Sequence, residues 1–142
     1  MPSESLFLLA MLNPFLPGDK KVYCRTVTES DIAAFESGTV HRVYSTFALA
    51  RDAEWACRLF VLEMKETDEE GIGTFVSVEH LAPALIGETV EFEAILESVR
   101  GNEVICTYTA RTRDKLIARG RQIQKVLKKE KLQRLLEKGT HE

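Results

Sequence analysis

The strongest constraint in this sequence is the stretch from residue 46 to residue 64, which predicts one long α-helix. Its apolar residues do not keep to one stripe but point in nearly all directions: Phe47, Leu49, Ala50, Ala53, Trp55, Ala56, Leu59, Phe60, Leu62 and Met64. A helix that is apolar on most sides is normally enclosed by other elements. The stretch therefore predicts a central helix, and it raises the question of why Glu54 stands in its middle.

Alternating apolar and polar residues predict strands on both sides of this helix. Before it, residues 20–28 alternate. Thr28 and Asp31 then suit the start of a short helix from about residue 29, and residues 36–45 look irregular. Beyond Gly71, turns separate four successive predicted strands at residues 73–85, 88–99, 103–112 and 116–127. Residues 128–138 predict a basic amphipathic helix, which we expect to pack through Leu132, Leu135 and Leu136.

One antiparallel sheet wrapped around one apolar helix satisfies this order, so the predicted class is α+β and the predicted architecture is the hotdog fold. We expect an N-terminal arm at 1–19, the hotdog domain at 20–127, and a basic C-terminal helix and tail at 128–142. Because a single sheet covers only part of such a helix, two chains are expected to pair.

Charge and cysteine content narrow the function classes. The formal net charge is -3, which argues against a protein that binds duplex nucleic acid. The odd cysteine count favours reduced, packed thiols. The apolar run near the N-terminus carries Glu4 and is interrupted by Pro14 and Pro17, so it predicts neither a signal peptide nor a membrane span. Leu6 to Leu12 is expected to form a packed apolar arm. We expect a cytoplasmic protein with no nucleic-acid or membrane partner.

Several common catalytic signatures are absent from the sequence, including the GxxxxGK[ST] phosphate loop and the GxSxG elbow. The histidines form no HxH or HExxH motif, so neither a metal nor a cofactor is predicted. The polar residues of interest are Thr46, Glu54 and His80. Each also has a structural explanation: Thr46 as a helix N-cap, and His80 as a solvent-exposed residue at a strand end.

The structural explanation for Glu54 is a helical row of ion pairs. Arg51 lies three residues before it and Arg58 four residues after it, so all three side chains would share one face of the helix. Spacing alone leaves this explanation and a catalytic one open.

Three segments together resemble one protein family. "YSTFALARDAEWAC", "EEGIGTFVSVEHLAPALIGETVEFEA" and "LIARG" are similar, in order and separation, to the fluoroacetyl-CoA thioesterase-like branch of the hotdog thioesterases. The resemblance implies an acyl-CoA thioesterase in which Thr46, Glu54 and His80 act with the backbone amide of Gly73. Two positions depart from the family: Val40 stands where the fluoroacetate-specific member has an aromatic lid residue, and "ARGRQIQK" replaces a strand often reading "GxGTHER".

The implied reaction is hydrolysis of a short or small acyl thioester. Glu54 would be the nucleophile or the general base, His80 would orient water or protonate the leaving sulfur, and the Gly73 amide would hold the oxyanion. Thr46 and Glu54, eight residues apart on one helix, would lie roughly 12 Å apart along its axis. Composite sites in a homodimer, or in a dimer of dimers, are therefore expected.

Two alternatives stay open: an acyl-CoA-binding module without catalysis and, ranked last, an enoyl-CoA hydratase using Asp31. Cationic residues that could meet the phosphates of coenzyme A are Arg100, Arg111, Arg113, Lys115, Arg119 and Arg121.

Overall fold

The computed structural model describes residues 11–35 and 38–140. In chain order the elements are β1 (Lys20–Thr26), the 3-10 turn η1 (Glu29–Asp31), β2 (Ile32–Phe35), β3 (Gly38–Tyr44), α2 (Thr46–Met64), β4 (Glu69–Val76), β5 (Glu79–His80), β6 (Thr89–Arg100), β7 (Glu103–Thr112), β8 (Lys115–Lys128) and α3 (Lys129–Thr140). The long helix is therefore present with the predicted bounds.

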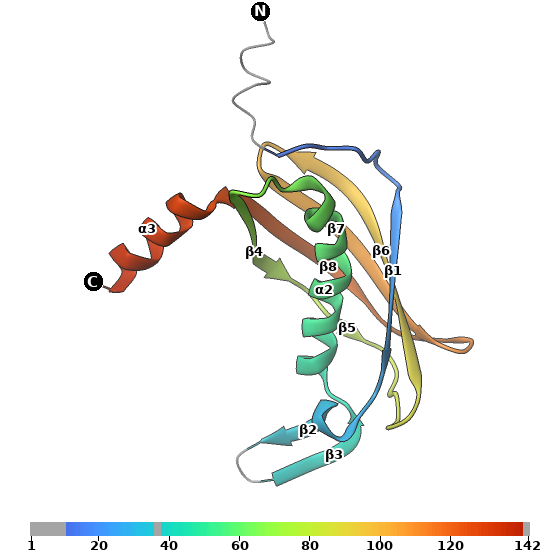
Figure 1. Ribbon diagram of the computed structural model, residues 1–142. Coiled ribbons are helices and arrows are strands. Elements are labelled where there is room, and N and C mark those ends of the chain that lie inside the picture. Colours follow the sequence, from blue (N-terminus) through green and yellow to red (C-terminus); the bar gives the residue numbers. More distant parts are fainter. Residues whose placement is uncertain (1–10, 36–37, 141–142) are drawn as a thin grey trace, which may run out of the picture.

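An antiparallel sheet in the order β1-β6-β7-β8-β4 curls around α2, with β5 paired to β8 (Figure 1). The alternation of β6 explains how the sheet holds the helix, because Val90, Phe92, Ala94 and Leu96 are all buried on its inner face. The predicted α+β arrangement is confirmed.

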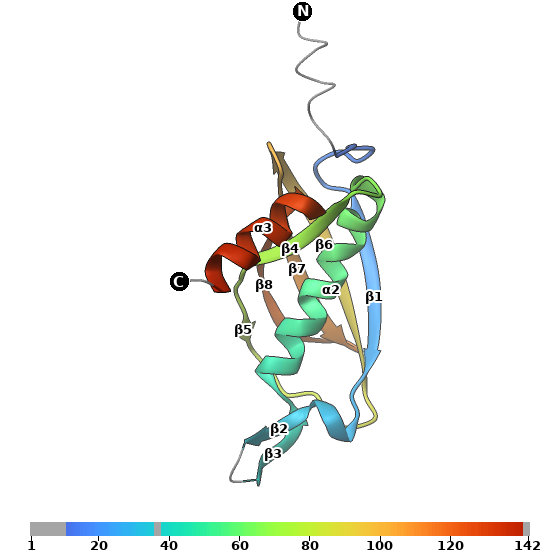
Figure 2. The same ribbon diagram turned by 60° about the vertical axis from the view of Figure 1, so that its left-hand side comes forward.

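Helix α2 buries the face that it turns toward the sheet, as the turned view shows (Figure 2). Its other face stays open: Phe47 is 87% exposed, Trp55 42% and Leu62 41%. Strand β4 forms one edge of the sheet, and Ile72, Phe75 and Val76 are exposed along it. One chain thus encloses only part of its apolar helix.

The prediction of an irregular segment at residues 36–45 was wrong. Strand β3 occupies most of this segment and pairs with β2 as a separate hairpin. The β2–β3 register shifts twice, between Ile32 and Ala33 and again between Ala33 and Ala34, so the alternation that marks a strand is lost in the sequence. The predicted strand at 73–85 is also different: β4 begins at Glu69 and breaks at Ser77 before the short β5.

The predicted N-terminal arm and the predicted packing of the C-terminal helix are only partly seen in the described residues. Most of the predicted arm at Leu6–Leu12 lies outside the described residues, but Phe15 packs edge-on against Phe60 with ring centroids 5.0 Å apart. Helix α3 leads away from the sheet beside the start of β4 (Figures 1 and 2). Leu132 is half-buried there, whereas Leu135 is 51% and Leu136 63% exposed, so the expected packing of this helix is made only in part. No helix in the described part of the chain could span a membrane.

The cysteines are only partly as predicted. All three are free, and Cys57 and Cys106 are buried, but Cys24 is exposed on β1. Two of the three thiols are therefore packed in the core.

Candidate active site

Two adjacent residues at the start of α2 make different contacts: one caps the helix, and the other meets His80. Ser45, not Thr46, is the N-cap: the Ser45 hydroxyl accepts a hydrogen bond from the backbone N–H of Ala48 at 3.0 Å. The Thr46 hydroxyl instead meets the imidazole of His80, with 2.9 Å between Oγ1 and Nδ1. The structure therefore excludes the capping explanation for Thr46 and brings two of the predicted site residues together.

His80 is held by the short strand β5, where it pairs with Ala118 of β8. It is half-buried, not fully exposed at a strand end. Burial lowers the pKa of the imidazole, and the nearby backbone of Ala82 offsets this only in part. Its Nε2 atom is buried and has no hydrogen-bond partner among the described residues. At neutral pH the ring is thus neutral, with one nitrogen engaged by Thr46 and the other without a partner in the described part of the chain.

Glu54 and Gly73 form a second close pair. A Cβ atom built on Gly73 would lie 2.2 Å from Oε1 of Glu54, so the carboxylate rests directly against the backbone of β4. Only glycine leaves room for this approach, because a Cβ contact below 3.0 Å forces something to move.

The predicted ion-pair row along α2 is not formed. Arg51 bonds to Asp31 and Asp52, and Arg58 bonds to Glu70 and to the carbonyl oxygen of Gly71. Within the described part of the chain, Glu54 forms no ion pair within 4.0 Å. The charge of Glu54 therefore has no structural partner of the kind that spacing suggested.

Two glutamines lie beneath Glu54, and sequence reasoning did not select them. Gln122 and Gln124 occupy inward positions of β8 and are 0% and 1% exposed. The amide nitrogen of Gln122 lies 3.4 Å from Oε1 of Glu54, and that of Gln124 lies 3.3 Å from the carbonyl oxygen of Glu54. The sequence did carry a signal for these two residues, because amides at two inward positions of a core strand need polar partners.

The two pairs do not meet within one chain. Thr46 and Glu54 lie on the same helix, about 12 Å apart along its axis. Glu54 also borders a cavity of about 340 Å³ on the open side of α2, lined by Tyr23, Arg25, Arg51, Asp52, Glu54, Trp55 and Arg58. One chain therefore keeps the two pairs of predicted site residues apart along α2.

Asp31 has a structural role. It is buried, and its oxygens accept bonds from Arg25, Arg51 and Thr28. Burial raises the pKa of this carboxyl, but the hydrogen bonds from the two arginines and Thr28 outweigh burial and hold the pKa well below its usual range. A carboxylate bound in this way ties η1 to α2 and is not available as a hydratase base.

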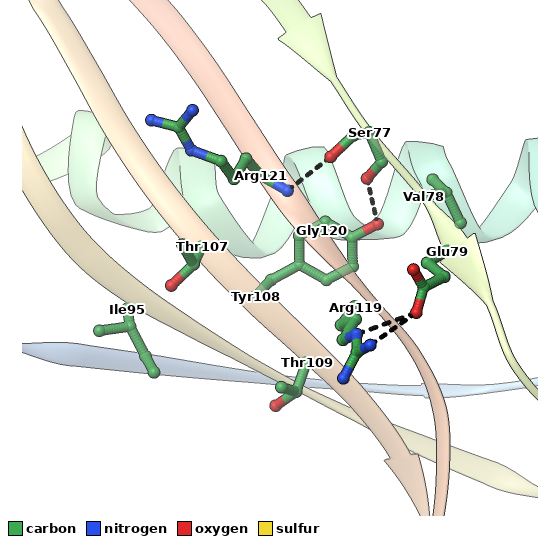
Figure 3. Close-up of a pocket in the computed structure, with 10 residues that line it drawn as sticks. All are labelled: Ser77, Val78, Glu79, Ile95, Thr107, Tyr108, Thr109, Arg119, Gly120 and Arg121. Carbon is green, nitrogen blue, oxygen red and sulfur yellow. Dashed lines mark hydrogen bonds and ion pairs between the residues drawn. The ribbon is translucent and has the colours of Figure 1, made fainter.

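A larger cavity of about 640 Å³ lies on the face of the sheet turned away from α2 (Figure 3). Two predicted phosphate-binding residues, Arg119 and Arg121, line it together with Thr107 and Thr109. Each arginine is already ion-paired, Arg119 with Glu79 and Arg121 with Glu97, both at 2.8 Å.

Two further residues that the sequence analysis singled out are Lys115, a predicted phosphate contact, and Val40, at the predicted lid position. Lys115 donates to the carbonyl oxygen of Pro83, and the side chain of Val40 lies outside the described residues.

The chain is similar to known proteins in sequence and in fold. A family model described as fluoroacetyl-CoA-specific thioesterase, FlK, matches residues 27–130. A hypothetical protein of Thermus thermophilus, described as a thioesterase superfamily member, is 35% identical over 92% of this chain and 96% of that chain, with a TM-score of 0.87. A hot-dog-like protein from Thermanaerovibrio acidaminovorans is 21% identical over 87% and 92%, with a TM-score of 0.79.

A mutant of FlK in complex with acetyl-CoA is 22% identical over 89% of this chain and 99% of that chain, with a TM-score of 0.81. No curated protein sequence matches the chain. The structural similarity extends over most of the sheet and α2, and it confirms the predicted fold.

Proposed function

Because this chain belongs to the fluoroacetyl-CoA-specific thioesterase family, and is a thioester hydrolase with the hotdog fold, we propose that it hydrolyses acyl-CoA esters of short or small acyl groups. The observation that carries the proposal is the pair of contacts along α2: Thr46 with His80 at its start, and Glu54 with Gly73 in its middle. The FlK complex with acetyl-CoA supports a small acyl group.

Glu54 supplies the attacking oxygen directly or through water. As a nucleophile, its carboxylate bonds to the acyl carbon while the carbon–sulfur bond breaks, and water then opens the mixed anhydride to regenerate the carboxylate. As a general base, it takes a proton from the water that attacks the acyl carbon. Lack of an ion-pair partner among the described residues leaves the carboxylate free for either route.

His80 and Thr46 serve the leaving group or the water. A thiol has a pKa of about 8.5, so expulsion of the thiolate needs little help compared with an alkoxide. The neutral imidazole bonds to the Thr46 hydroxyl, and its Nε2 has no partner among residues 11–35 and 38–140, so this nitrogen can hold a water or the departing sulfur. The low pKa suits a ring that must be neutral at the working pH.

Gly73 contributes its backbone. A donor that meets the developing oxyanion is typically worth about 3–4 kcal/mol. The absence of a side chain at residue 73 lets a thioester approach the β4 backbone beside Glu54.

A homodimer would bring together the two pairs of site residues, Thr46 with His80 and Glu54 with Gly73. Edge strands are templates for pairing with another chain, and β4 is an edge strand with exposed Phe75 and Val76. Pairing of β4 with its symmetry copy also covers the open face of α2, where Phe47 and Trp55 are exposed. In this assembly Glu54 of one protomer works with the partner's Thr46 and the partner's His80. A dimer of dimers is compatible with the same contact.

The experiment is an acyl-CoA panel in which purified protein is mixed with each ester and thiol release is followed. Substituting Glu54→Gln or His80→Ala should each lower the rate by at least about 100-fold. Full activity in either variant would remove that residue from the site.

Mixing the two inactive variants tests the composite site. Half of randomly mixed dimers are hybrids, and one of the two sites in each hybrid has both wild-type groups. Activity should therefore return to about a quarter of the wild-type rate. No recovery, with hybrids shown to form by mass spectrometry, would place both groups of a site in one chain.

An acyl-CoA-binding module is the second candidate function. The change of the last strand to "ARGRQIQK" favours it, because this strand departs from the "GxGTHER" form that the family often shows. Thermal stabilisation by acyl-CoA esters without thiol release would support binding over hydrolysis. A cytoplasmic location stays a prediction.

A further inference from the structure

We propose that Gln122 is a positioning residue for Glu54: its side-chain amide holds the carboxylate against Gly73 in the orientation from which it acts. The inference rests on the proposed role of Glu54, and it concerns a residue that the family motif does not supply.

The position of Gln122 is unusual for an amide. Gln122 and Gln124 are nearly fully buried on the inner face of β8, beside apolar residues such as Val104 and Val126. A buried amide without hydrogen bonds costs stability, so a side chain of this kind in a sheet core needs partners. Two of the hydrogen bonds found here reach one residue of α2, Glu54, while the side-chain oxygen of Gln124 has no partner among the described residues.

The hydrogen bonds form a short relay that fixes Gln122. The amide nitrogen of Gln124 donates to the side-chain oxygen of Gln122 at 3.0 Å. With its oxygen taken, Gln122 turns its nitrogen toward Oε1 of Glu54 at 3.4 Å and the carbonyl oxygen of Ile123 at 3.2 Å. The nitrogen of Gln124 also reaches the carbonyl oxygen of Glu54 at 3.3 Å. Both the carboxylate and the main chain of residue 54 are therefore tied to β8.

The charged neighbours of Glu54 are engaged with other groups. Arg25 bonds to Asp31, Arg51 bonds to Asp31 and Asp52, and Arg58 bonds to Glu70, although all three arginines line the cavity beside Glu54. The carboxyl group of Asp52 is held by Arg51 and Tyr44, and Glu70 accepts from Arg58. The Cys57 thiol is buried next to this turn of α2, and its pKa is raised chiefly by its contact with Cys106, with burial and the Glu54 charge adding to it.

A neutral donor suits the carboxylate better than an arginine would. An arginine holds a carboxylate in a strong two-point ion pair, which competes with attack on a substrate. A single amide fixes one oxygen, Oε1, which is also the oxygen nearest to Gly73, and leaves Oε2 without a hydrogen bond among the described residues. Gln122 and Gly73 together therefore fix the direction in which Glu54 points.

The first test compares Gln122→Met, which keeps the length of the side chain but removes the donor, with Gln122→Glu. In Gln122→Met, kcat should fall about 10- to 100-fold with KM changed less than about twofold, because the lost contact orients a reacting group. In Gln122→Glu, the acid limb of the kcat/KM profile should move up by about one pH unit or more, since two adjacent carboxylates share a proton. Gln133→Met, on the exposed side of α3, is the matched control and should leave both unchanged.

The second test does not depend on activity. The chemical shift of the Glu54 side-chain carboxyl is measured by NMR at pH 7 in the substrate-free wild type and in both Gln122 variants. It should differ from the wild-type value in each variant, because the hydrogen-bond donor to Oε1 is lost or replaced by a carboxylate. The same chemical shift in all three proteins would overturn the contact.

The two tests separate this inference from the proposed function. A wild type that hydrolyses no acyl-CoA would end the hydrolase proposal, while the NMR comparison at pH 7 still decides whether Gln122 holds Glu54. A wild type that is active and loses activity in Glu54→Gln, but keeps its kcat and pH profile in both Gln122 variants, would overturn only the role of Gln122.

Discussion

The carboxylate of Glu54 occupies the space that a side chain at residue 73 would need, since a Cβ atom on Gly73 would lie 2.2 Å from Oε1 of Glu54. Residues 54 and 73 come from different elements, α2 and β4, and no local rule links them. The contact explains why a carboxylate in an apolar helix can be kept close to a backbone and still be reached from the open edge of the sheet.

Replacing Gly73 by alanine should reduce activity strongly with little loss of stability. The new methyl group displaces only the end of the Glu54 side chain, so the fold can adjust, but a misplaced reacting group can cost about 100-fold in rate. Acyl-CoA hydrolysis and thermal unfolding of Gly73→Ala measure both effects. Gly139→Ala is the control, because its Cβ would meet nothing within 4 Å. Wild-type activity in Gly73→Ala would show that Glu54 need not rest against β4.

Thr46 offers a test of the hydroxyl alone. Thr46→Val removes the group that meets Nδ1 of His80 and should lower kcat about 10- to 100-fold, while Thr46→Ser keeps the hydroxyl and should retain most of the rate. The cap of α2 is not affected, since Ser45 provides it. Equal rates in the valine and serine variants would mean that the hydroxyl does not orient His80.

His80 should make the folded state sensitive to acid. Its pKa is lowered by burial, so below about pH 6.5 the unfolded chain takes up a proton at this residue more readily than the folded chain. The stability that His80 contributes is present above that pH and is lost as the pH falls through the lowered folded value. Thermal unfolding between pH 8 and pH 5 should show a steeper decline in the wild type than in His80→Gln. Parallel curves would contradict a buried neutral imidazole.

Asp31 should matter for stability rather than for chemistry. Asp31→Asn leaves the guanidinium groups of Arg25 and Arg51 without their shared buried carboxylate and should destabilise the fold by about 3 kcal/mol at pH 7. Because the pKa of Asp31 is held well below its usual range, this contribution is present above about pH 4 and declines as the pH falls further. Urea unfolding at pH 7 and at pH 3 measures the difference.

The control for Asp31 is another acidic residue of the same turn. Glu29 pairs with Arg42 on the surface, with both side chains more than 60% exposed, so Glu29→Gln should change stability very little. A loss in Glu29→Gln as large as in Asp31→Asn would show that burial of the carboxylate is not what makes Asp31 important.

Local pattern was enough to predict the central helix and most of the sheet. The apolar residues from Phe47 to Met64 predict a helix that must be enclosed, and the alternation from Val90 to Leu96 predicts the strand face that encloses it. It was not enough for β3, because two register shifts in the β2–β3 pairing disturb the alternation. Nor did it assign the N-cap, since Ser45 and Thr46 are adjacent and both suit the position.

The sequence by itself therefore determined the central helix and most of the strands, and which polar residues stand out against them, because these depend on spacing along the chain. Only the tertiary structure decided the partners: that Arg51 and Arg58 bond away from Glu54, that Gln122 donates to it, and that Thr46 meets His80. Hydrogen bonds and ion pairs act over a few ångströms in space, and β8 lies 68 residues from Glu54 along the chain at the contact with Gln122. Residue spacing cannot encode such a contact before the sheet has closed around the helix.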